Sequence, residues 1–95
     1  MEFQIENNTE SELAEEKVRE ALNRSAEALP KEDDLEVVID YSDFDFIKEK
    51  MNGVMGMPRG SSKIEMSFHP ESSNWPEFLA SMTCHEFAHT FYSEK

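Results

Sequence analysis

The chain has little cysteine, few basic residues and no long apolar run. Its 95 residues include a single cysteine, so no disulfide can form within one chain, as is usual in a reducing compartment. No apolar run approaches the roughly 18 residues that a membrane-spanning helix requires. The N-terminus also lacks the basic and apolar parts of a secretion signal. We therefore expect a cytoplasmic protein without a membrane segment.

The shortage of basic residues makes the chain strongly acidic. Its 9 Lys and Arg residues are outnumbered by 21 Asp and Glu residues, which gives a formal net charge of −12. Such a surface repels phosphate backbones and anionic lipids, so the composition argues against nucleic-acid and membrane partners. We interpret the charge as a solubilising surface, with adaptation to high salt as the alternative.

The N-terminal third predicts a strand followed by an amphipathic helix. Phe3 to Ile5 alternates weakly, as a short strand would. Thr9 and Glu12 have the spacing of a capping box, which opens a helix that ends near Leu29, before a proline. One stripe of this helix should face the core: Ala14, Val18, Ala21, Leu22, Ser25 and Leu29.

The rest of the chain predicts two further strands and two further helices. Leu35 to Tyr41 contains three consecutive β-branched residues and is the strongest strand signal. An acidic stretch over 43–49 indicates a short helix, and Gly53 to Gly60 indicates a flexible segment with turns. Lys63 to Phe68 alternates as a half-buried strand does, alone or in a hairpin. No repeat or linker divides residues 1–95, so we expect one α+β domain: an N-terminal helix packed on a small mixed sheet, followed by a last helix.

The most informative segment is the pentapeptide His85-Glu86-Phe87-Ala88-His89, an H-E-x-x-H motif. On a helix, residues i and i+4 are about 40° apart around the axis and about 6 Å apart along it, so two imidazoles can bind one ion. The glutamate lies where it can take a proton from bound water. We therefore predict His85 and His89 as zinc ligands and Glu86 as the catalytic base. The alternative is two ordinary histidines with this spacing by chance, which arises in roughly one or two such chains per hundred.

The motif requires a helix, and residues 76–92 predict one. Asn74 or Ser73 can cap it, Pro76 suits its first turn, and Glu77 completes a sequence similar to a capping box. We expect both histidines on a buried face, shared with three apolar side chains: Phe78, Met82 and Tyr92. A second apolar stripe comprises Ala80, Cys84, Phe87 and Phe91, in which we interpret Cys84 as a packing residue and not a ligand.

A zinc site needs a third protein ligand, which the motif does not supply. His69, 16 residues before His85, is one candidate, although a histidine at a surface turn is its ordinary interpretation. Glu65 and Glu71 are weaker candidates. Glu94 lies five residues past His89, about 140° around the helix axis, and should point away.

Four segments form a wider pattern around the motif: Gly53–Gly56, Ile64–Phe68, Asn74–Leu79 and Thr83–Thr90. With this pattern, residues 35–93 resemble the predicted zinc-dependent proteases, a family that is widespread in bacteria and archaea. The resemblance implies a zincin-like domain of the gluzincin type, with His85 and His89 as ligands and Glu86 as the acid/base. In such families a third ligand, usually a glutamate, lies on a later helix. We therefore expect residues 1–95 to form the N-terminal half of a catalytic domain.

The predicted function is that of a zinc-dependent metallopeptidase that hydrolyses peptide or protein substrates. In such enzymes an edge strand commonly pairs with the extended substrate, and Lys63–Phe68 would be that strand. One alternative is an inactive fragment or regulatory module, which associates with itself or with a complementing chain through an exposed apolar face at Phe87 and Phe91. Another is a structural zinc module closed by His69.

Overall fold

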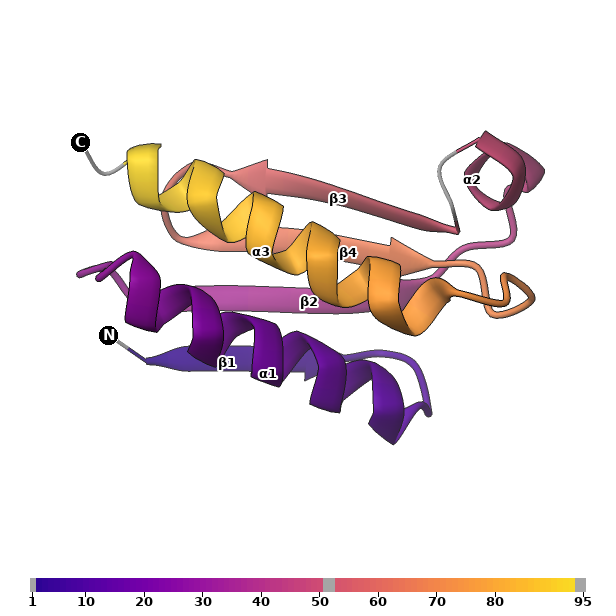
Figure 1. Ribbon diagram of the computed structural model, residues 1–95, viewed down its shortest axis with the longest axis horizontal. Helices are drawn as coiled ribbons and strands as arrows, with labels where there is room; N and C mark the ends of the chain where they lie inside the picture. Colours follow the sequence, from indigo (N-terminus) through magenta and orange to yellow (C-terminus); the bar gives the residue numbers. More distant parts are fainter. Residues whose placement is uncertain (1, 51–52, 94–95) are drawn as a thin grey trace.

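Two long helices lie side by side on one face of a four-stranded mixed sheet (Figure 1). This computed structural model describes residues 2–50 and 53–93. The strands are β1 (Phe3–Asn7), β2 (Leu35–Tyr41), β3 (Val54–Arg59) and β4 (Lys63–Phe68), and the helices are α1 (Glu12–Ala28), α2 (Asp45–Lys50) and α3 (Trp75–Ser93). The predicted α+β class, with an N-terminal helix on a small mixed sheet, is confirmed.

The strand order, β1-β2-β4-β3, places β4 inside the sheet. β2 runs parallel to β1 on one side and to β4 on the other. β3 and β4 form an antiparallel hairpin in which Val54 lies opposite Phe68 and Arg59 lies opposite Lys63. The prediction that Lys63–Phe68 forms an edge strand is therefore wrong. The glycine-containing segment that the sequence presents as flexible is instead β3, which covers β4 and is itself the edge.

The core lies between the sheet and the two helices. Alternate residues of β4, Ile64, Met66 and Phe68, are buried, as the period of two in a half-buried strand predicts. β2 contributes Leu35, Val37 and Ile39 to the same layer. The predicted stripe of α1 is confirmed in five of its six members, Ala14, Val18, Ala21, Leu22 and Ser25, whereas Leu29 is half-buried.

The start of α1 differs from the predicted capping box. The N-cap is Ser11, whose Oγ accepts a hydrogen bond from the Ala14 backbone N–H at 3.1 Å. Thr9 instead lies in the preceding turn, where its backbone N–H and its hydroxyl both donate to Asn7 Oδ1 at 3.0 and 2.6 Å. The Asn7 side chain therefore holds Thr9 outside the helix and leaves the capping position to Ser11.

Within the described part of the chain, none of the helices combines the length and apolar character needed to span a membrane. The longest, α3, is where the H-E-x-x-H motif lies.

Candidate metal centre

The motif occupies the interior of α3, beyond its first two turns. Asn74 directly precedes the helix, and its carbonyl accepts a hydrogen bond from the Phe78 backbone N–H at 3.2 Å, which agrees with the predicted cap position. Two threonines in the buried face satisfy their hydroxyls within the helix. Thr83 Oγ1 donates to the Leu79 carbonyl and Thr90 Oγ1 to the Phe87 carbonyl, both at 2.7 Å. Both side chains can therefore pack in the core without a further polar partner.

The two histidines lie on the exposed side of α3, so the prediction of a buried histidine face is wrong. The buried face instead comprises Leu79, Thr83, Glu86, Phe87, Thr90 and Phe91. Of the His85 side chain, 62% is exposed, against 5% of the Glu86 side chain. Because α3 contacts α1 on one side and β3 and β4 beneath, its buried arc centres on Thr83 and Phe87 and turns the histidines to solvent.

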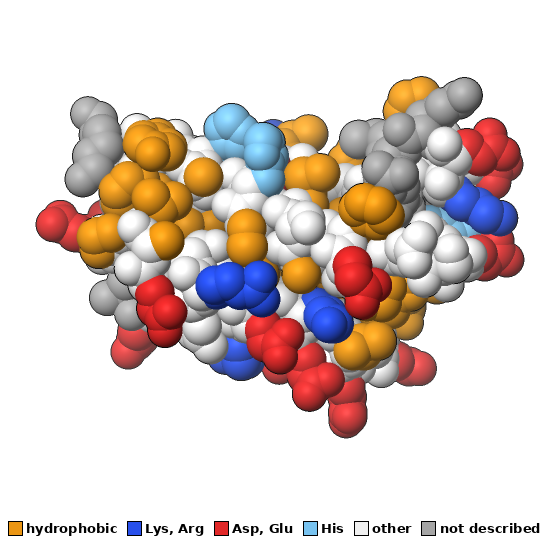
Figure 2. All heavy atoms as spheres, viewed as in Figure 1, with side chains coloured by type: hydrophobic (Ala, Val, Ile, Leu, Met, Phe, Trp, Pro, Cys, Tyr) orange, Lys and Arg blue, Asp and Glu red, His pale blue; other side chains and the backbone are white. Residues whose placement is uncertain are grey.

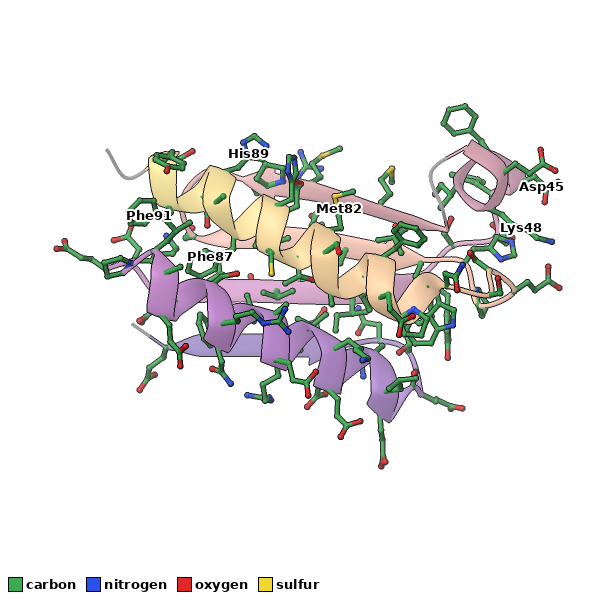
Figure 3. The ribbon with its side chains drawn as sticks, viewed as in Figure 1. Asp45, Lys48, Met82, Phe87, His89 and Phe91 are labelled. Carbon is green, nitrogen blue, oxygen red and sulfur yellow. The ribbon has the colours of Figure 1, made fainter. Side chains whose placement is uncertain are left out.

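The same packing buries Phe87 and Phe91, so the prediction of an exposed apolar patch at these residues is wrong. Phe87 is fully buried and makes an edge-to-face contact with Phe3, with 6.4 Å between the ring centroids, and Phe91 is buried too. Figure 3 shows Phe87 on the side of α3 toward α1, whereas His89 and Met82 lie on the side along β3. Cys84 is half-buried, and its Sγ lies 3.7 Å from the Ala21 carbonyl of α1, which agrees with its interpretation as a packing residue.

The Nε2 atoms of the two imidazoles lie within hydrogen-bonding distance, slightly closer together than around a shared zinc ion. His85 Nε2 and His89 Nε2 lie 3.1 Å apart. Zinc holds histidine nitrogens at about 2.0–2.1 Å, so a tetrahedral angle separates two of them by about 3.3–3.4 Å. Glu86 Oε1 lies 3.7 Å from His85 Nε2, and the three potential ligand atoms lie within 4.8 Å of one another. The donor set and its spacing therefore fit a zinc ion.

Glu86 is held between α3 and the edge strand, at a position that depends on Gly56 of β3. A Cβ atom added at Gly56 would lie 2.8 Å from Glu86 Cγ and 2.9 Å from both Met66 Sδ and Met82 Cγ. Such distances are too short for real contacts, so only glycine leaves room for the Glu86 side chain here. Gly56 was not among the predicted site residues. The sequence feature that could have indicated its role is a glycine inside a segment that otherwise fits a strand.

The structure does not bring the proposed third ligands to the two histidines. His69 is 5% exposed at the end of β4, so a surface turn is the wrong description, and its Nδ1 accepts from the Glu71 backbone N–H at 3.2 Å. Glu65 forms an ion pair with Arg59, and Glu71 forms one with Lys48. Glu94 lies outside the described residues. Within 2–50 and 53–93, His85, Glu86 and His89 form the only group of three side chains suited to a metal.

No protein-family model, curated protein or solved structure matches the chain. The resemblance to the predicted zinc-dependent proteases therefore stays a prediction, and the interpretation of the site depends on the residues themselves.

Proposed function

We propose that this chain carries the zinc-binding and catalytic helix of a zinc-dependent peptidase. The observation that supports this most is the arrangement on α3, where the Nε2 atoms of His85 and His89 converge at 3.1 Å beside the buried carboxylate of Glu86. His85 and His89 would bind the ion, and Glu86 would transfer the proton from the attacking water to the leaving amine. When bound, zinc would act as a Lewis acid toward water and toward the substrate carbonyl.

In this proposal Glu86 is the general base and then the general acid. Its carboxylate takes the proton of the attacking water and gives it to the amine that leaves when the peptide bond breaks. The side chain packs over Gly56, so it has little freedom to turn away from the histidines. A base held in one position loses less entropy on reaching the transition state, which favours proton transfer.

The substrate would bind along β3 as an additional strand. β3 ends the described sheet, and α3 crosses it closely enough for Glu86 to contact Gly56. An extended peptide that pairs with this edge would therefore run past Glu86, with main-chain hydrogen bonds supplying much of the affinity. Pro58 suits this position because an edge strand tolerates a residue without an N–H donor. The strand assigned to the substrate thus changes from Lys63–Phe68 to Val54–Arg59.

Hydrolysis of unstructured peptides by the zinc-loaded protein tests the proposal. We expect Glu86→Gln to lower turnover by about 10²–10⁴-fold, the usual contribution of a general base, while its zinc content stays at the wild-type level. His85→Ala and His89→Ala should lose zinc and turnover together. Wild-type zinc stoichiometry in His89→Ala, or full turnover in Glu86→Gln, would contradict the assignment.

A second candidate is a metal-binding interaction module without catalysis. It is favoured by the exposure of His85 and by the presence of only two histidine ligands in the described group. The same experiment separates the two functions, because this module would bind zinc through both histidines yet hydrolyse no peptide.

A further inference from the structure

The histidine pair leaves a zinc ion with too few protein ligands. Two imidazoles provide two nitrogen ligands, and the third member of the group is the buried Glu86 carboxylate, which packs against β3. Zinc that is held for structural purposes takes four protein ligands in a closed tetrahedral set. His85 is largely exposed, so a second protein molecule can approach the pair from solvent.

The surface around the pair is almost free of charge, although the chain as a whole carries a formal charge of −12. Five side chains follow one stripe of α3, and none of them is an acid or a lysine or arginine: Phe78, Met82, His85, His89 and Tyr92. Figure 2 shows the pale blue histidines at the upper edge among mostly orange and white atoms, whereas red and blue atoms gather over α1 and near α2. Two acidic copies therefore repel each other least at this stripe, where a divalent cation would lower the repulsion further.

Around the histidines this stripe is symmetric. From Met82 onward its steps are three, four and three residues, so Met82 and Tyr92 are equally far from position 87, which lies midway between the histidines. Each is about 7.5 Å along the axis from that midpoint. Phe78 lies beyond Met82 and has no counterpart among the described residues. If two α3 helices cross in antiparallel fashion, each histidine pair faces the other, and Met82 of one copy meets Tyr92 of the partner subunit. A two-fold interface requires this self-complementarity, and thioether sulfurs pack favourably against aromatic rings.

We infer that two copies of this chain bind one zinc ion between them through their His85 and His89 side chains. Four imidazoles then complete the tetrahedral set, and Met82 and Tyr92 flank it on both sides. The inference rests on the metal-binding part of the proposed function and not on hydrolysis. Because the four imidazoles leave no position for water, the dimer is the inactive form of the proposed peptidase. A zinc excess, at one ion per chain, returns the protein to monomers.

Sedimentation velocity during a zinc titration of the metal-free protein tests this inference. We expect the 11.0 kDa monomer to double in mass and the dimer to peak at one zinc ion per two chains. His85→Ala and His89→Ala should stay monomeric at every zinc concentration, with circular dichroism confirming that they fold. Glu77→Gln, an exposed change on the same helix, should dimerise like the wild type. Tyr92→Ser should weaken the zinc-bound dimer by about tenfold.

Three outcomes would overturn the inference: a monomer at every zinc concentration, a dimer that persists in His85→Ala, or a dimer with one zinc ion per chain. Peptide hydrolysis by the same samples separates this failure from that of the proposed function. Hydrolysis by a protein that never dimerises would support the peptidase and reject the dimer. A dimer with one zinc ion per two chains, in a protein that hydrolyses no peptide at any zinc level, would support the dimer and reject the peptidase.

Discussion

The two long helices pack side by side on the same sheet, yet their solvent sides differ. α1 buries one narrow stripe, and most of its remaining surface is charged, as is common in a helix that only packs. α3 has two charged residues in its whole span, Glu77 and Glu86, and the second is buried. Its solvent side instead carries two histidines, a tyrosine and a phenylalanine, with a half-buried methionine beside them. Packing on the sheet does not require such a surface, and the proposed binding role of α3 rests on this difference from α1.

The largest expected effect tests whether the buried side of α3 stabilises the fold while its histidine side does not. Phe87 is fully buried, so Phe87→Ala should lower the free energy of unfolding by about 3–5 kcal/mol through lost burial and a cavity. His89, two residues later, is exposed, so His89→Ala should change the free energy of unfolding by less than about 0.5 kcal/mol. Urea unfolding of both metal-free variants measures the difference. An equal loss in the two variants would mean that the histidine side of α3 also stabilises the fold.

The next effect concerns the contact of α3 with β3. Gly56→Ala would place its methyl group against Glu86, Met66 and Met82, which should lower the free energy of unfolding by about 1–3 kcal/mol. Because Glu86 is displaced while the histidines are not, zinc binding should persist and hydrolysis should fall by about 10²-fold. Zinc content, turnover and urea unfolding measure these changes.

Gly60 supplies the control for Gly56. It has a positive φ of 68° and no atom within 4 Å of an added Cβ, so Gly60→Ala should cost about 1 kcal/mol of stability and leave hydrolysis unchanged. If both variants lose turnover equally, the contact between Gly56 and Glu86 does not position the base.

The smallest effect concerns α1. Removing the Ser11 hydroxyl by Ser11→Ala should lower the free energy of unfolding by about 1 kcal/mol, because the Ala14 N–H loses its acceptor. Ser11→Thr keeps an acceptor and should retain most of the stability. Neither variant should alter zinc binding, as measured by elemental analysis after dialysis. A loss of zinc in Ser11→Ala would show that α1 takes part in the site after all.

Elements with a strong local pattern were predicted well. β2 and β4 have the predicted bounds, and the stripe of α1 is nearly complete, because burial on one side imposes a period of two on a strand and of about 3.6 on a helix. β3 was mistaken for a flexible segment because Gly53, Gly56 and Pro58 are all poor strand formers. Its hydrogen bonds come from β4, a partner that its own composition does not reveal. A strand of this kind is stabilised by its pairing and not by its propensity.

The candidate site was likewise predicted only in part. His85, Glu86 and His89 were identified from their spacing, and they lie together because the helix repeat alone brings them together. Their exposure was predicted wrongly, because α3 is apolar on several sides and its periodicity does not indicate which side the sheet and α1 will cover. Gly56 was missed because its role depends on a contact with Glu86, which lies thirty residues later in the chain.

Short-range chemistry was therefore sufficient to specify the helices, three of the four strands and the three side chains of the candidate site. It could not specify which strand ends the sheet, which side of α3 meets solvent, or that Glu86 lies over a glycine of the edge strand. These features depend on contacts between segments far apart in the chain, and such contacts are selected by the burial of the whole core and by the pairing of complete strands. The histidine spacing can thus be predicted from little more than one turn of α3, whereas the surface on which the histidines lie is a property of the assembled fold.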